Sequence, residues 1–228
     1  MKQLFFFIAL SLISALTYAQ TCDMFFPLEE GASWEITHYN AKGKEQDTQV
    51  NTIISKKTVD QGEEASIKME VKDAKEKDQV DIEYTVLCAK EYLEMDITMF
   101  TPDNKATETE GIEVEMTTKN LEFPNILTEG LELAPGSMKM TTTMNGIKVS
   151  SMEINIIDRK VAGIETITTP AGTFECFKIT QTSKFKMGFM KFETSSITYF
   201  AKNVGIVKTE NYDKKGKLDS YQELTKIN

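Results

Sequence analysis

The chain has 228 residues, with 26 basic against 35 acidic side chains and a formal charge of −9 when histidine is neutral. Arg159 is its only arginine. An acidic chain without arginine clusters lacks the usual means of gripping phosphates, so nucleic acid and anionic membrane surfaces are not expected partners.

A secretory signal peptide is expected over residues 1–19. Lys2 precedes an uncharged run from Leu4 to Leu16, and a small residue, Ala19, precedes the expected cleavage site. The apolar run is shorter than the roughly 20 residues that span a bilayer, and no later segment approaches that length, so no transmembrane span is expected. The residues before Cys22 do not resemble a lipoprotein box. We therefore expect an exported protein, periplasmic or at the cell surface, with residues 20–228 forming a single β domain.

Period-2 alternation predicts a chain made almost entirely of strands. In residues 93–99, for example, apolar Leu93 and Met95 alternate with acidic Glu94 and Asp96. Such alternation is typical of antiparallel strands with one buried and one solvated face. The expected strands are residues 33–39, 48–55, 65–71, 82–88, 93–99, 112–118, the two arms of a hairpin over 137–156, 162–168, 174–182, 191–200, 205–212 and 217–225.

Two of the turns share a motif. The segments HYNAKGKEQ, residues 38–46, and NYDKKGKLD, residues 211–219, both place Asn or Asp three residues before a glycine. We expect Asn40 and Asp213 to open type I turns and Gly43 and Gly216 to supply the positive φ that follows. In a third copy over 71–79, Glu76 replaces the glycine, which predicts a strained or longer turn.

The predicted fold class is all-β. Helix signals are confined to residues 101–111, where we expect a short helix or a mobile loop, and to residues 123–137, where we expect at most one or two helical turns. The inner faces of about ten strands amount to on the order of 2,000 Å² of apolar surface, several times what a soluble monomer exposes. The sheet must cover itself, so we expect a curved antiparallel meander closing into a half-barrel or barrel, with a β-sandwich as the alternative.

The hairpin SMKMTTTMNGIKVSSMEINI, residues 137–156, is rich in methionine. Asn145-Gly146 is a strong two-residue turn signal. With that turn, Met138 and Met140 share a face with Met144, but the apolar residues from 152 onward fall on the opposite parity.

A β-bulge at Ser150-Ser151 would restore one common face. It would place Met152 opposite Met140 and Ile154 opposite Met138. Methionine provides a pliable apolar surface for variable ligands, but it also fills ordinary cores. The candidate ligand-binding face consists of Met138, Met140, Met144, Met152 and Ile154.

Three cysteines, Cys22, Cys88 and Cys176, would tend to leave one unpaired thiol in an oxidising compartment. All three pairings are open. We favour a disulfide between Cys22, on the amino-terminal segment, and Cys88, at the end of a strand that such a segment can reach. No CxxC occurs, so redox and zinc sites have little support.

No catalytic, metal or cofactor motif occurs. His38, the only histidine, shares the parity of Trp34 and Ile36 and is expected to be hydrogen-bonded or exposed at a strand end. The motifs GxSxG, SxxK and HExxH and the phosphate loop are missing. We therefore expect no enzyme, no cofactor and no metal.

The segments ETITTPAGTFECFKIT, residues 165–180, and YFAKNVGIVKTENYDKKGKLDSYQELTKI, residues 199–227, resemble the TapB-type family of small exported proteins from Gram-negative bacteria. A wider group of periplasmic proteins with PAGTF and VGIVK elements is more distantly similar. The likeness covers nearly all of residues 20–228. It supplies no catalytic residues, and it implies a curved sheet similar to the half-barrels of lipoprotein carriers such as LolA, which hold acyl chains.

Two functions fit these observations. The first is a non-enzymatic carrier or sensor that holds a lipid or other apolar molecule against the methionine face. The second is a protein-interaction or envelope-structural module that packs its methionines in a closed core and presents acidic faces or loops to a partner. An open trough favours the first, and a closed core favours the second.

Overall fold

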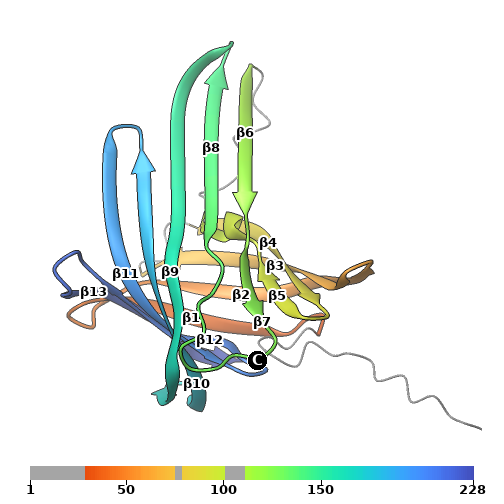
Figure 1. The fold of residues 1–228 in the computed structure, drawn as a ribbon, viewed down its shortest axis with the longest axis vertical. Coiled ribbons are helices and arrows are strands. Elements are labelled where there is room, and N and C mark those ends of the chain that lie inside the picture. The colour runs from red at the N-terminus through yellow and green to blue at the C-terminus, as the bar shows by residue number, and fades with distance from the viewer. Residues whose placement is uncertain (1–28, 75–78, 101–110) are drawn as a thin grey trace, which may run out of the picture.

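The computed structural model describes residues 29–74, 79–100 and 111–228, which form one antiparallel sheet with a single 3-10 helix (Figure 1). The strands are β1 (Ser33–Asn40), β2 (Glu45–Val59), β3 (Gly62–Asp73), β4 (Gln79–Ala89), β5 (Tyr92–Met95), β6 (Ile112–Lys119), β7 (Leu121–Pro124), β8 (Gly136–Met144), β9 (Ile147–Thr169), β10 (Gly172–Met187), β11 (Met190–Ala201), β12 (Gly205–Tyr212) and β13 (Leu218–Ile227), and the helix is η1 (Ile97–Phe100). The all-β prediction is confirmed.

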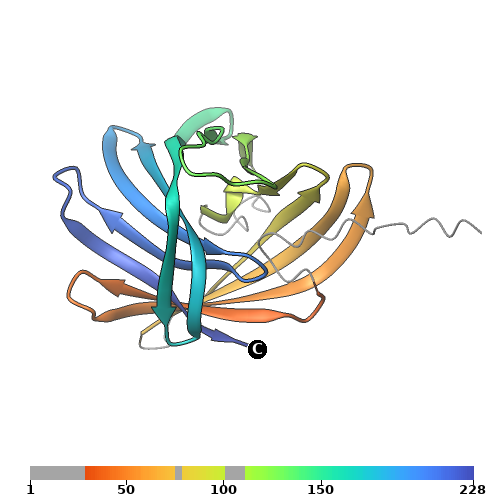
Figure 2. The same ribbon diagram turned by 60° about the horizontal axis from the view of Figure 1, so that its bottom comes forward.

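The two edges of this sheet belong to one stretch of chain. The strand order is β6-β8-β9-β10-β11-β12-β13-β1-β2-β3-β4-β5-β7, and β7 follows β6 after a single residue. β6 pairs with β8, whereas β7 pairs with β5. The stretch 112–124 therefore bridges the two ends of the sheet and makes a nearly closed barrel (Figure 2). The β-sandwich alternative is wrong.

Arg159 fastens this closure from inside. Its guanidinium is buried, and Nη1 donates hydrogen bonds to the carbonyl oxygens of Glu122 (3.2 Å) and Ala134 (2.5 Å). The guanidinium also lies 4.6 Å from the ring centre of Phe123. Burial lowers the pKa of Arg159 to about 10, which still leaves it protonated at neutral pH. Arg159 thus ties β7 and the segment before β8 to β9.

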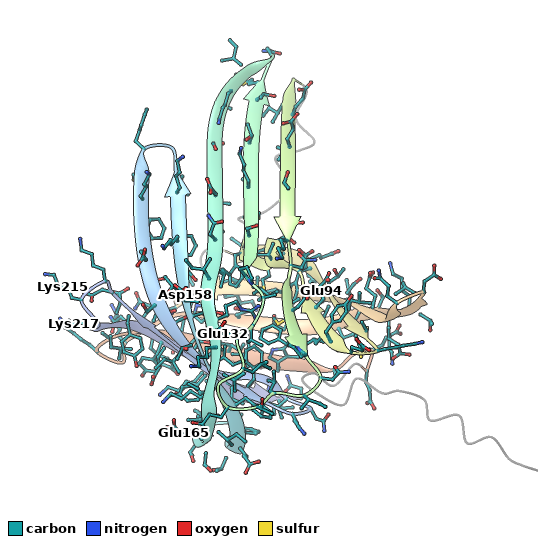
Figure 3. The ribbon with its side chains drawn as sticks, in the orientation of Figure 1. Glu94, Glu132, Asp158, Glu165, Lys215 and Lys217 are labelled. Atoms are coloured by element: carbon teal, nitrogen blue, oxygen red, sulfur yellow. The ribbon has the colours of Figure 1, made fainter. Side chains whose placement is uncertain are left out.

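The segment between β7 and β8 contains no helical turn, so that expectation is wrong. It runs along β9 instead: Glu132 forms an isolated β-bridge with Lys160, and the Leu133 N–H donates to the carbonyl oxygen of Arg159 (2.8 Å). Figure 3 shows Glu132 beside β9, near Asp158. Backbone groups in this segment are satisfied by pairing rather than by helix formation.

The strand expected over residues 93–99 is wrong in its second half, because β5 stops at Met95 and η1 begins at Ile97. Asp96 causes the break. Its carboxylate accepts a hydrogen bond from the Thr98 N–H (2.9 Å), and its carbonyl accepts one from the Met99 N–H (3.4 Å). Such local bonds compete with sheet pairing.

The two repeated turns are confirmed. The Asn40 side chain accepts the N–H groups of Lys42 (2.9 Å) and Lys44 (3.1 Å), and Gly43 has φ +75°. Asp213 and Gly216 repeat this arrangement in the turn between β12 and β13. The turn predicted at Glu76 lies outside the described residues, and so does the short helix or loop expected over 101–111, apart from Gly111.

The bulge in the hairpin of β8 and β9 exists, but not at Ser150-Ser151. Ser150 and Ser151 occupy successive ladder positions opposite Thr142 and Thr141, and Val149 is the residue without a partner. Asn145 and Gly146 both have positive φ, as a type I′ turn requires. The bulge therefore lies closer to the turn than predicted, with the same effect on register.

Candidate functional site

The interior of the barrel holds two adjacent pockets that share part of their lining, and we call them the two lobes of the cavity. One lobe has a volume of about 280 Å³ and the other about 240 Å³. The residues that line both lobes come from β5, η1, β12 and β13: Met95, Met99, Phe100, Ile206 and Gln222. The helix that interrupts the predicted strand thus places Met99 and Phe100 between the lobes.

One wall of the larger lobe is apolar. It is formed by side chains of β5, β7, β9 and η1, among them Leu121, Phe123, Ile154 and Ile156. Ile154 and Ile156 alternate with outward residues on β9, and Phe123 packs against Phe200 with ring centres 5.0 Å apart. This wall is continuous with the main hydrophobic core.

The facing wall carries hydroxyl and amide groups. Ser183, Ser196 and Thr198 are buried on β10 and β11, and Thr209 on β12 donates to the Thr198 hydroxyl (3.3 Å). Asn211 and Gln181 complete this side of the lobe. The larger lobe therefore has one face suited to hydrocarbon and another suited to hydrogen bonding.

A buried amide group faces the smaller lobe. Asn51 is fully buried, and its side-chain oxygen accepts hydrogen bonds from Gln49 Nε2 (3.0 Å) and the Tyr84 hydroxyl (3.4 Å). Its Nδ2 has no protein partner. Burial raises the pKa of Tyr84, so this phenol stays neutral. A buried donor without a partner costs about 1–3 kcal/mol, so Asn51 offers a place for an acceptor.

His38 lines the same lobe together with Trp34 and Ile36, as its parity predicted. Its Nδ1 lies 2.9 Å from Oδ1 of Asp47 on β2, and its Nε2 is buried without a partner. His38 lies near the end of β1, as predicted. A second polar atom at this end of the cavity thus lacks a protein partner.

The cavity walls contain no Asp, Glu, Lys or Arg side chain. In the part of the chain that the structure describes, no cluster of three potential metal ligands occurs. The described residues also include no helix long and apolar enough to cross a bilayer. The lining can therefore hold hydrocarbon and accept or donate hydrogen bonds, but it offers no lysine, arginine or carboxylate as a counter-ion.

The predicted ligand-binding residues share one face of β8 and β9, as expected, but they do not surround the cavity. Ile154 lines its larger lobe, whereas Met138, only 1 % exposed, and Met152 pack into the core. Met140 is half-buried, and Met144 near the hairpin turn is 47 % exposed. Their role in ligand binding stays a prediction.

Cys176 is a buried free thiol, so neither pairing that involves it occurs. Burial raises the pKa of this thiol to about 11, with help from Glu165 and Glu175. Cys88 is buried at the end of β4, but Cys22 lies outside the described residues, so the Cys22–Cys88 disulfide stays a prediction.

Sequence reasoning missed the polar cavity wall. Gln49, Asn51, Ser196 and Thr198 occupy inward positions that alternation reserves for apolar residues. In β2 the outward positions include Val50, so hydrophobicity alone did not identify the inner face. The available signal was the pairing of β2 with β1, whose inner face is fixed by Trp34 and Ile36.

Comparisons with known proteins agree with the fold. The family model described as DUF3108-like matches residues 29–224. The chain belongs to this DUF3108-like family. The narrower TapB-type resemblance stays a prediction, and a search of curated proteins finds no match.

Two solved structures have similar folds. A Bacteroides fragilis protein classed as exported, with a YmcC-like fold, is 24% identical over 91% of this chain and 100% of its own, with a TM-score of 0.74. A Parabacteroides distasonis protein classed as a lipoprotein is 25% identical over 92% of this chain and 100% of its own, with a TM-score of 0.73. The chain therefore has the YmcC-like barrel fold.

Proposed function

We propose that this protein is a non-enzymatic carrier of the bacterial envelope that holds an uncharged amphipathic molecule, of lipid type, inside its barrel. The observation that carries the proposal is the two-lobed cavity with one apolar and one polar wall and no fixed charge. Each lobe lies just below the range of about 300–1,000 Å³ typical of small-molecule sites, so a molecule of that size would occupy both lobes. Export is supported by the expected signal peptide and by two structural relatives classed as exported and as a lipoprotein.

The chemistry of the walls favours a neutral head group over an anionic one. A carboxylate or phosphate placed here would lose its water without gaining a lysine or arginine, which is costly. An ester, amide or alcohol oxygen could instead accept a hydrogen bond from Nδ2 of Asn51. The hydrocarbon part would then lie along Met95, Phe123 and Ile154.

Competition between matched ligands tests this proposal. Lauroylglycerol, laurate and dodecane share a similar hydrocarbon chain but carry a neutral, an anionic or no head group. In displacement of the fluorescent probe N-phenylnaphthylamine at neutral pH, lauroylglycerol should show the highest apparent affinity of the three. Asn51→Leu should lower the affinity for lauroylglycerol by about tenfold, which corresponds to the loss of one hydrogen bond. The affinity for dodecane should not change.

Two adjacent serines provide a matched pair for blocking the cavity. Ser196 is buried in the polar wall, whereas Ser195 is exposed on the other face of β11. Ser196→Phe should abolish binding of the probe, and Ser195→Phe should not, with thermal unfolding confirming that both variants fold. The proposal is refuted if native mass spectrometry detects no bound ligand in any mixture of the protein with the three test ligands. It is also refuted if Ser196→Phe and Ser195→Phe bind the probe equally.

The alternative, a protein-interaction or envelope-structural module with a closed methionine core, also stays a prediction. Met138 and Met152 are buried, as that alternative requires. Met144, Met187 and Met190 are exposed, however, so the methionine face is not closed along its whole length.

A further inference from the structure

The ends of two neighbouring hairpins collect exposed apolar side chains. Of the thirteen large hydrophobic residues that are exposed in the described part of the chain, seven lie at these ends, in residues 144–149 and 187–192. Phe189, in the turn between β10 and β11, is fully exposed, and Ile147 beside the turn of β8 and β9 is 70 % exposed. The other five are Met144, Val149, Met187, Met190 and Phe192. This concentration exceeds the scattered exposure that is normal for a soluble surface.

The two ends are neighbours, with the β10–β11 turn lying beside the β9 arm of the longer β8–β9 hairpin (Figure 1). Figure 1 shows the hairpins β8–β9 and β10–β11 rising side by side from the barrel. The Gly188 N–H donates to the carbonyl oxygen of Ser151 (3.1 Å), and Met187 lies opposite Met152 in the ladder. We call the exposed residues 144–149 and 187–192 the hairpin ends.

Lysines of the two hairpins accompany this apolar surface, with two carboxylates beside them: Glu153 lies opposite Lys186 in the ladder, and Glu113 on β6 accepts a hydrogen bond from the Thr143 hydroxyl (3.4 Å). Residues 137–152 and 184–192 contain five lysines and no Asp or Glu, in a chain where acidic side chains outnumber basic ones. Lys184 pairs with Glu193 (3.6 Å), but Lys148, Lys186 and Lys191 form no ion pair with any described residue. The hairpin ends are therefore apolar, and three lysines on or next to them are free to meet an anionic partner.

From this combination we propose that the hairpin ends dock on an anionic phospholipid surface. Phe189 and Ile147 would enter the interfacial region, while the lysine ammonium groups remain at the level of the lipid phosphates. Each basic residue near such a surface adds attraction. The two-residue turn at Gly188-Phe189 exposes little unpaired backbone, which suits an apolar boundary.

The acidic charge of the whole chain, which argued against anionic membrane surfaces in the sequence, does not strongly oppose docking by the hairpin ends alone. Ser183 lies in the barrel wall, and the five residues from there to Gly188 span about 17 Å of strand. Screening acts over about 10 Å at 0.1 M salt, so charges on the barrel are largely screened at the hairpin ends. Glu113 and Glu115 are nearer, because β6 pairs directly with β8 and places them opposite Thr143 and Thr141, so they offset part of the lysine charge at the end of the β8–β9 hairpin.

A second copy of this chain is a poorer occupant of the same surface. In a symmetric dimer each patch meets itself, which would bring Lys148 and Lys191 of one copy toward the same lysines of the other. Like charges in close contact are destabilising. An anionic bilayer relieves that repulsion and covers the apolar side chains at the same time.

Co-sedimentation of the mature protein with vesicles tests the proposal. We expect binding to vesicles of phosphatidylglycerol and phosphatidylethanolamine, weaker binding at high salt, and little binding to phosphatidylcholine alone. Phe189→Ser with Met190→Ser should lower binding by at least about tenfold. Lys186→Gln with Lys191→Gln should lower it by about tenfold.

Matched controls lie at other positions of the barrel. Ile164, also exposed, is next to Glu165 at the opposite end of β9, and Lys215 and Lys217 occupy the turn between β12 and β13 (Figure 3). Ile164→Ser, or Lys215→Gln with Lys217→Gln, should leave binding unchanged. The proposal is overturned if anionic vesicles do not bind, if the variants at the hairpin ends bind like the unmodified protein, or if Phe189→Ser with Met190→Ser turns a dimer into a monomer in size-exclusion chromatography.

Discussion

Met140 on β8 lies directly opposite Met152 on β9. The same row continues across the sheet to Met116 on β6, to Met187 on β10 and to Met190 on β11. Five methionines from five neighbouring strands thus form one transverse row on the inner face. The row begins half-buried at Met116 and becomes exposed at Met190, 65 % of which is accessible.

This gradient predicts an order of oxidation. Methionine oxidation to the sulfoxide follows exposure, so hydrogen peroxide should modify Met190, Met187 and Met144 well before Met138 and Met152. Peptide mapping by mass spectrometry after brief treatment would measure the order. Equal rates at Met138 and Met190 would contradict the described packing of the hairpins.

The bulge at Val149 predicts an asymmetric response to single deletions. Removal of Val149, which has no ladder partner, leaves Met152 opposite Met140. Removal of Thr142 on the other strand moves Met138 to the outer face, because a slip of one residue inverts a strand. We expect the Val149 deletion to change the free energy of unfolding by less than about 0.5 kcal/mol and the Thr142 deletion to cost about 1.5–3 kcal/mol, the burial of one methionine. Urea denaturation would compare the two.

Local pattern predicted the strands and turns because these depend on neighbours in sequence. The parity of Met138 and Met152 even required a bulge, although pattern could not place it: an extra residue anywhere between 148 and 151 restores the same face. Asn40 and Asp213 formed the predicted turns because an Asx side chain bonds the backbone a few residues ahead.

The closure and the cavity depend on non-local pairing, and alternation does not encode that. Nothing near Asn120 indicates that β6 and β7 pair with strands from opposite ends of the sheet. Likewise, Asn51 and Ser196 are polar residues at inward positions, where pattern predicts apolar ones. The candidate site was missed for this reason: its recognition groups depart from the pattern that identified the fold.

Among the charged residues of the described barrel, Arg159 should lower the free energy of unfolding most when it is substituted. Arg159→Met keeps much of the side-chain volume but leaves the carbonyls of Glu122 and Ala134 without their donor. A buried group left unsatisfied costs about 1–3 kcal/mol, so we expect a loss of that order in the free energy of unfolding. Lys160→Met, at the exposed neighbouring position, should change the free energy of unfolding by less than about 0.5 kcal/mol. Similar losses in both variants would show that Arg159 does not fasten the closure.

The twin turns predict a local pH response with an internal control. Asp213 accepts the N–H groups of Lys215 (2.8 Å) and Lys217 (3.0 Å), and these bonds lower the pKa of its carboxyl. A carboxyl with a folded-state pKa below its ordinary value stabilises the fold above that ordinary value, and the contribution is lost as pH falls through the folded-state pKa. The Asn40 turn has the same geometry and does not titrate.

Hydrogen exchange followed by NMR would compare the two turns. As pH falls below the ordinary range for aspartate, the protection factors of the Lys215 and Lys217 amides should decrease, while those of Lys42 and Lys44 should hold. Asp213→Asn should remove the difference, because the amide accepts the same bonds without a charge. A parallel decline in both turns of the unmodified protein would assign the change to global acid unfolding rather than to Asp213.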